Sequence, residues 1–208
     1  GATYPFWSPD SAWIGFFAGG QLRKISPAGG NPQPICAAAE GRGATWSQNG
    51  TIVFSDVTGT RGLSRVSEAG GTATPVTTLQ TQGSSDGHRY PQFLPDGEHF
   101  LFLYLAARAD VGGVYVGALD GTTPVRVREE QDAALYTASP ASRGKAGYLL
   151  FRQQGTLMAQ AFDPDRRQTS GAMFPVAEGV GQGQNTGVAA FSVSAAGTLA
   201  HGPGIGVL

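Results

Sequence analysis

Four kinds of segment in this chain carry residue types that catalytic or metal sites use. Ser142 and Lys145 have the Ser-x-x-Lys spacing of serine acyl-enzymes, and residues 181–187, GQGQNTG, have the composition of a phosphate cradle. Asp163-Pro164-Asp165 offers oxygen ligands of the kind that calcium loops use. Histidine stands at positions 88, 99 and 201. Each of these chemistries depends on a particular supporting element, so the surrounding sequence decides whether it can operate.

None of these segments has the support that its chemistry needs. A Ser-x-x-Lys nucleophile begins a buried helix, whereas Ser142 lies in a glycine-flanked loop between two predicted strands. A phosphate cradle leads into a helix, but residues 188–194, VAAFSVS, have the pattern of a strand. The Asp163–Asp165 turn lacks the closing glutamate of a calcium loop, and the histidines share no zinc-binding spacing. We therefore predict no catalytic residue, no metal and no cofactor here.

A repeated pattern runs through the chain. Residues 4–17, YPFWSPDSAWIGFF, contain an aromatic pair, a Ser-Pro-Asp-Ser turn and an apolar run. Similar copies, weaker toward the C-terminus, span residues 43–55, 90–105, 135–151 and 189–202. The anchors Trp7, Trp46 and Phe93 are 39 and 47 positions apart, a period typical of solenoids, propellers or arrays.

The segment after each copy defines the type of repeat. After each of the first four copies comes an alternating run, a Gly-rich or Asp-rich turn and a second short run; Ala28-Gly29-Gly30 and Ala69-Gly70-Gly71 are nearly the same turn. Each unit is therefore predicted to be four antiparallel strands, which is one blade of an all-β propeller. We expect a single propeller domain, or a fragment of one, with blades at about 1–39, 41–80, 87–129 and 133–178 and a partial fifth at 187–208.

The repeat also predicts which side chains are structural. Trp7, Trp46 and Phe93 should be buried in equivalent places between neighbouring sheets, and the second strands should bury Phe16, Phe54, Phe102 and Phe151. The carboxylates of Asp10 and Asp96 should cap the backbone of hairpin turns. The second, fourth and fifth copies lack the Pro-Asp pair, so their turns are expected to differ.

The stretches FWSPDS, WSQNG and FLPDG, each preceding an apolar strand, resemble the WD40-like or TolB-type β-propeller repeat. The longer stretches 1–30, 88–103 and 155–180 resemble the C-terminal propeller of bacterial membrane-anchored serine/threonine kinases. No kinase catalytic motif is present, so this resemblance implies the sensor portion of such a protein, in a periplasmic or other extracytoplasmic compartment.

Composition excludes some classes of partner. Charged residues make up 14% of the chain and the net charge is -1, which disfavours nucleic acid and anionic membrane surfaces. No apolar run approaches the roughly 20 residues of a membrane span. The single cysteine, Cys36, excludes an internal disulfide.

The innermost strands predicted for the propeller contain neither Asp nor Glu, so we expect that the chain is not an enzyme. Recognition residues instead gather just before these strands, at one mouth of the central channel. The predicted ligand-binding residues are Tyr4, Arg42, Asp86, His88, Arg89, Tyr136 and Asn185. The alternative is that these residues join neighbouring blades through hydrogen bonds.

Three functions remain open. The first is a module that senses a small molecule or binds a protein, split from a receptor kinase or similar envelope protein. The second is the gating propeller of a hydrolase or peptidase. The third is a self-assembling module, since an incomplete fifth blade leaves apolar faces that a homodimer through the open ends would cover. The competing outcome is a small ring closed by contact between the first and last blades.

Overall fold

The computed structural model describes residues 1–56, 61–81, 83, 85–139, 146–183, 187–194 and 197–203. Blade one contains β1 (Thr3–Trp7), β2 (Ile14–Ala18), β3 (Gln21–Ile25) and β4 (Gln33–Ala37). Blade two contains β5 (Gly41–Trp46), β6 (Thr51–Asp56), β7 (Leu63–Ser67) and β8 (Thr74–Pro75). Blade three contains β9 (Gly87–Phe93), β10 (His99–Leu105), β11 (Gly113–Ala118) and β12 (Val125–Arg128). Blade four contains β13 (Leu135–Ala138), β14 (Gly147–Gln153), β15 (Thr156–Asp163) and β16 (Gln168–Ala177), and a half-blade contains β17 (Phe191–Val193) and β18 (Leu199–His201).

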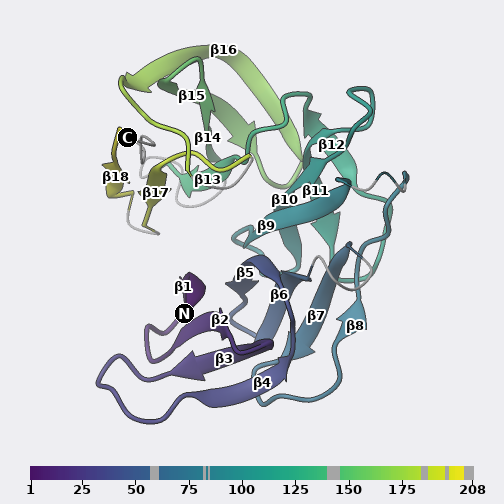
Figure 1. The fold of residues 1–208 in the computed structure, drawn as a ribbon. Helices are drawn as coiled ribbons and strands as arrows, with labels where there is room; N and C mark the ends of the chain where they lie inside the picture. The colour runs from purple at the N-terminus through teal and green to yellow at the C-terminus, as the bar shows by residue number, and fades with distance from the viewer. Residues whose placement is uncertain are drawn as a thin grey trace.

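The fold is an all-β propeller with four complete blades and a partial fifth, as predicted. Each complete blade is an antiparallel sheet in which consecutive strands are neighbours, and the half-blade is one antiparallel pair. The first strand of each blade is innermost, because β1 packs against β5, β5 against β9, and β13 against β17. Figure 1 shows the sheets arranged around a common axis, with β1 and the half-blade on the same side. Within the described residues no helix is long and apolar enough to cross a membrane.

One hydrogen bond closes the first hairpin in every blade. The backbone N–H of the residue after the innermost strand donates to the carbonyl of the residue at, or just before, the start of the second strand. The pairs are Ser8 to Trp13 at 2.9 Å, Ser47 to Thr51 at 2.9 Å, Leu94 to His99 at 2.8 Å, Ser139 to Ala146 at 3.1 Å and Ser194 to Thr198 at 2.9 Å. The recurrence of this bond in the half-blade shows that its two strands are the first two of a blade.

The turns inside these hairpins are capped by short polar side chains. Asp10 Oδ1 accepts from Ala12 N at 3.0 Å, and Asp96 Oδ1 accepts from Glu98 N at 3.0 Å, which confirms their predicted structural role. Asn49 Oδ1 accepts from Thr51 N at the same 3.0 Å. The turn of blade two differs as expected, since its closing bond spans four positions, Ser47 to Thr51, and not the five of Ser8 to Trp13. Its cap is nevertheless of the same kind, because an asparagine amide oxygen replaces the carboxylate oxygen.

The core lies between blades. Phe54 and Trp46 of blade two, 1% and 6% exposed, pack into a cluster with Phe17 and Leu22 of blade one. The predicted burial of the second-strand phenylalanines is confirmed: the series is Phe16, Phe54, Phe102 and Phe151. Each blade after the first thus buries one face against the blade before it, and removing any one sheet would expose apolar surface.

Trp7 departs from the predicted pattern, since its side chain is 56% exposed. Its equivalent Trp46 lies with its ring centroid 6.1 Å from that of Phe6, on the preceding blade. Phe93 likewise packs toward blade two as part of a partly buried layer. Blade one has no preceding blade packed over this position. The prediction that Trp7 is buried is wrong, because its burial requires a neighbouring sheet that the half-blade does not supply.

The two tryptophans therefore give a matched stability test. Trp46→Ala removes the contact with Phe6 and the 2.8 Å hydrogen bond from Trp46 Nε1 to Glu68, and we expect it to cost about 3–5 kcal/mol. Trp7→Ala should cost less than about 1 kcal/mol because most of that side chain already faces solvent. Denaturant titration measures both values. Equal losses in the two variants would contradict this packing between blades.

Candidate functional site: the axial cavity

Three innermost strands carry the same backbone irregularity. Tyr4, Gly43 and Tyr90 have φ of 49°, 95° and 54°, and each lies three residues before the aromatic or tryptophan anchor of its strand. Strand pairing shifts at each of these points, so each is a bulge. Two of the three are tyrosines, for which this left-handed conformation is strained. The strain is repeated in register around the propeller axis, where the strands meet.

Glycine is required at the middle bulge. A Cβ atom on Gly43 would lie 2.9 Å from the Cα of Tyr90, on the next innermost strand. Blades two and three can therefore approach closely at the axis only because this side chain is missing. The residues that follow each bulge line an open space.

That space is a cavity of about 770 Å³, and we call it the axial cavity. Its walls are the C-terminal halves of β1, β5 and β9, the first residue of β13, the first-hairpin turn of blade one, and the end of β17. The lining residues are Pro5, Phe6, Trp7, Ser8, Pro9, Ser11, Ala44, Thr45, Trp46, Pro91, Gln92, Phe93, Leu135, Ser192, Val193 and Ser194. None of these described lining residues carries a charge.

Most polar groups in the lining are already engaged. Thr45 Oγ1 accepts from Phe93 N at 3.0 Å. The side-chain amide of Gln92 donates to Tyr136 O at 3.0 Å and accepts from Tyr136 N at 2.6 Å. These two bonds link β9 of blade three to the backbone of β13 of blade four. The wall presents to an occupant mainly the rings of Trp7, Phe6 and the prolines. The cavity is therefore suited to an apolar or aromatic group.

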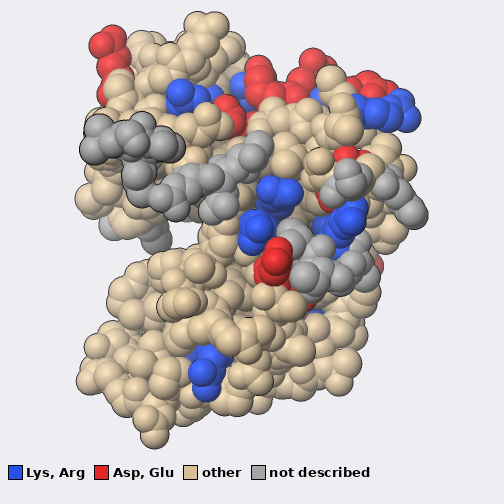
Figure 2. All heavy atoms as spheres, in the orientation of Figure 1, with Lys and Arg blue, Asp and Glu red and all other residues tan. Residues whose placement is uncertain are grey.

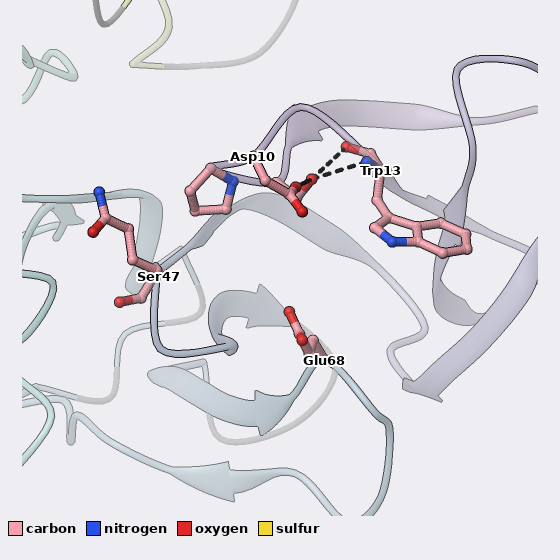
Figure 3. A pocket seen from close by; sticks show the side chains of 7 residues that line it. Asp10, Trp13, Ser47 and Glu68 are labelled. Carbon is pink, nitrogen blue, oxygen red and sulfur yellow. Dashed lines mark hydrogen bonds between the residues drawn. The ribbon is translucent and has the colours of Figure 1, made fainter.

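A smaller pocket of about 340 Å³ lies between the turns of blades one and two. Figure 3 shows Asp10, Trp13, Ser47 and Glu68 around it. The Lys24 ammonium lies 4.8 Å from the Trp13 ring centroid and donates to Glu68 O at 2.9 Å. Asp10 accepts from Ser8 Oγ at 2.6 Å. These groups join one blade to the next or hold one turn, so this pocket is a structural joint between blades.

Two of the predicted binding residues lie together at the opposite end of the innermost strands. Tyr4 and Arg42 line a cavity of about 360 Å³ with Glu40, whose carboxylate is 3.7 Å from the Arg42 guanidinium. The buried hydroxyl of Tyr4 makes no hydrogen bond of acceptable geometry within the described structure. Burial, with the nearby Tyr4, raises the pKa of Tyr90 to about 12. This end of the innermost strands therefore carries charged and hydroxyl side chains, whereas the described lining of the axial cavity carries no charge.

Asp86 and His88 are not at the mouth, because the structure buries both between blades two and three. His88 is 2% exposed, with Nδ1 2.7 Å from Thr77 Oγ1, and its carbonyl accepts from Ser55 Oγ at 2.7 Å. Asp86 accepts backbone N–H bonds from Gly83 and Ala107, each at 2.8 Å. Both residues are buried in the joint between these blades, so, contrary to the prediction, they are not accessible to a ligand.

The other predicted residues have three different outcomes. Tyr136 is 6% exposed and packs edge-on to Phe162 in the core between blades three and four, so it does not reach the mouth either. Arg89 is half-buried, and its Nε has no hydrogen-bond partner within the described structure. Asn185, together with Ser142 and Lys145, lies outside the described residues.

The axial cavity is not evident from the sequence pattern. Most of the predicted binding residues lie in the first halves of the innermost strands, whereas the cavity is lined mainly by the residues at the C-terminal ends of these strands. Trp7, Trp46 and Phe93 were interpreted as core because burial and recognition use the same aromatic side chains. The repeated Tyr-Pro pairs at Tyr4 and Tyr90 were the available signal for the bulges.

Solved structures of similar fold include regucalcin, a calcium-binding protein from Agrobacterium tumefaciens, with a TM-score of 0.64 and 16% identity over 95% of this chain and 65% of that one. TolB from Acinetobacter baumannii matches with a TM-score of 0.61 and 16% identity over 86% of this chain and 44% of that one. A luciferin-regenerating enzyme matches with a TM-score of 0.61 and 12% identity, over 84% and 59%. No family model and no curated protein matches the chain.

The fold is thus that of β-propellers of the TolB and regucalcin type. The chain spans roughly half to two thirds of the length of these structures. One of them is an enzyme, which corrects the expectation that this chain is not one. The reason is that a propeller without carboxylates on its innermost strands can still carry reactive groups on its loops, so the fold and those strands do not exclude catalysis.

The buried His88 gives a pH test of the joint between blades two and three. Burial lowers the pKa of His88 from 6.5 to about 3. Between pH 6.5 and about pH 3, His88 takes up a proton in the unfolded chain but not in the folded chain. The contribution of neutral His88 to the free energy of unfolding is therefore complete above pH 6.5 and decreases as the pH falls. Replacing His88 by glutamine should reduce the stability lost between pH 7 and pH 4.5 by about 2–3 kcal/mol. Denaturant titrations of both proteins at the two pH values measure this, and parallel curves would contradict it.

Proposed function

We propose that this propeller is a binding module that holds an extended, uncharged segment of a partner protein in the axial cavity. The observation that carries the proposal is the exposed ring of Trp7 in a cavity lined by aromatic and proline side chains and free of charge among its described residues. An exposed tryptophan in the wall of a concave, mainly apolar surface is typical of residues that dominate binding energy.

The shape of the molecule supports an extended ligand. The axial cavity is bounded on one side by Trp7 and on the other by Ser192, Val193 and Ser194 of the half-blade. Figure 2 shows an opening between the part of the molecule that carries blade one and the part that carries the half-blade. A chain segment can therefore enter from the side, with one apolar side chain in the cavity and its backbone along the opening.

The sequence resemblance to kinase propellers supports a sensing role for such binding. In that setting, capture of a segment by the propeller is the input to which the rest of the protein responds. The neutral lining supports specificity against charged segments, because a buried charge without a partner would lose its hydration. The proposal concerns binding and leaves open what chemistry loops of the whole protein perform.

The test uses an array of decapeptides, half of them uncharged and half carrying Lys or Asp at each alternate position. Uncharged peptides with an aromatic residue should be retained, and the best of these is then titrated in solution by tryptophan fluorescence. Trp7→Ala should weaken its binding by about tenfold, since loss of one central aromatic contact is worth at least about 1.4 kcal/mol. Selection of charged peptides would refute the proposed ligand class.

Trp13→Phe is the matched control. Trp13 lies outside the axial cavity, in the joint between blades one and two, and its replacement should leave the affinity unchanged. If both variants lose affinity equally, the effect comes from the stability of blade one and the axial cavity is not the site.

A further inference from the structure

The pocket between blades one and two carries charges that the joint between these blades does not use. Its lining residues are Ser8, Pro9, Asp10, Trp13, Ser47, Gln48 and Glu68, and we call it the joint pocket. Figure 3 shows the carboxylates of Asp10 and Glu68 and the Trp13 ring around one space. At about 340 Å³ this space holds far more than one water molecule, which takes about 30 Å³.

One oxygen of each carboxylate is held, and the other is free. Asp10 Oδ1 accepts from Ser8 Oγ at 2.6 Å and from Ala12 N at 3.0 Å, and Glu68 Oε2 accepts from Trp46 Nε1 at 2.8 Å. Among the described residues, Asp10 Oδ2 and Glu68 Oε1 accept no hydrogen bond, and neither carboxylate forms an ion pair. The bonds from Ser8 and Ala12 also lower the pKa of Asp10. Two fixed negative charges therefore line one pocket without a counter-ion.

The joint between blades two and three has the same construction without the second carboxylate. In both joints a cation on a third strand donates to the carbonyl of the residue that follows the third strand of the next blade. The two bonds run from Lys24 to Glu68 and from Arg65 to Leu119, each at 2.9 Å. Leu119 therefore occupies the position that Glu68 has in the first joint, so the carboxylate of Glu68 is not needed to build a joint.

The turn aspartate is also neutral or paired in the next two blades. Asn49 caps the turn of blade two as Asp10 caps that of blade one. In blade three, Asp96 Oδ2 lies 2.6 Å from His99 Nδ1. His99 and Trp13 are equivalent, because the carbonyl of each accepts the bond that closes its hairpin. An indole thus stands in blade one where blade three places the partner of its aspartate.

The Trp13 ring already attracts a cation. The Lys24 ammonium lies 4.8 Å from its centroid, but it does not line the joint pocket and it donates to the backbone carbonyl of Glu68. With Lys24 counted, the pocket keeps a net negative charge. An indole face combined with carboxylates is suited to an organic ammonium group. A neutral ligand would displace water from the two carboxylates without supplying an opposite charge.

We propose that the joint pocket binds an organic ammonium ion. The cationic head lies between the free oxygens of Asp10 and Glu68, and its methyl or methylene groups lie against Trp13. The indole favours an organic cation over a metal ion, and the described residues contain no group of three His, Cys, Asp or Glu side chains placed to hold a metal. None of these three residues lines the axial cavity, so the inference does not rest on the proposed function.

The test is an NMR titration of the full chain with choline, observed at the indole N–H of Trp13. This signal should shift saturably at about millimolar choline. The neutral analogue of choline, in which carbon replaces the nitrogen, should bind at least about tenfold more weakly because it leaves both carboxylates without a counter-charge. Equal binding of the two compounds would overturn the proposal. So would a shift confined to the Trp7 indole, or displacement of choline by calcium at lower concentrations than choline itself requires.

Conservative variants remove each charge and keep the local structure. Asp10→Asn retains the turn cap, as Asn49 shows in blade two, and should weaken choline binding about threefold. Glu68→Gln retains an acceptor for Trp46 Nε1 and should have a similar effect, so the double variant should lose about tenfold. Trp13→Leu should lose at least about threefold. Unchanged affinity in the double variant would refute the site.

Asp120→Asn is the matched control. Asp120 caps an exposed turn through Thr122 N at 2.9 Å and lies in the pocket of the next joint, so its loss should leave choline affinity unchanged. A loss equal to that of Asp10→Asn would show a net-charge effect and overturn the site. The ratio of choline to n-butylamine affinity assigns the source as a quaternary headgroup or a primary amine such as a lysine side chain. Lys-containing decapeptides that the Asp10→Asn chain no longer retains report the joint pocket and not the axial cavity.

Discussion

The packing of each blade on the blade before it is the constraint on which the rest of this structure depends. Trp46 and Phe54 reach back to blade one, and Phe100 and Phe102 reach back to blade two. A sheet of four short strands cannot bury its apolar face by itself, so that face needs a neighbouring sheet. Directional bonds add alignment: Lys24 donates to the carbonyl of Glu68 and Arg65 to that of Leu119, each at 2.9 Å and each from the third strand to the next blade.

The axial cavity is a by-product of this packing and also depends on it. The strained residues Tyr4 and Tyr90 keep their left-handed backbone because the packing between blades holds the strands in register. Gly43 lets β5 and β9 approach closely at the axis. The walls of the cavity are therefore as rigid as the contacts between blades, which favours a preformed site over one that assembles around its ligand.

Much of the fold could be predicted from the sequence, because aligning the repeated copies shows their period and the equivalent positions in each blade. The alternation and glycine turns defined the strands, and the aligned phenylalanines at Phe54 and Phe102 defined the core. Trp7 could not be placed in the same way, since an identical side chain is buried or exposed according to whether a neighbouring sheet is present. The site was harder still: nothing local distinguishes a buried, neutral His88 from a ligand-binding histidine, because its environment comes from Thr77, Phe102 and Tyr104, which lie elsewhere in the chain.

The open arc also determines how this molecule can come apart. In a closed ring every sheet has two neighbours, and loss of any one of them breaks two contacts. Here blade one and the half-blade each border a gap, whereas blades two and three are packed on both sides and share the buried joint at His88. Stability in such a linear array is a sum of nearest-neighbour terms, so disorder enters from the ends and moves inward. Within this stretch of sheets, blades two and three are consequently expected to lose their structure after blade one and the half-blade.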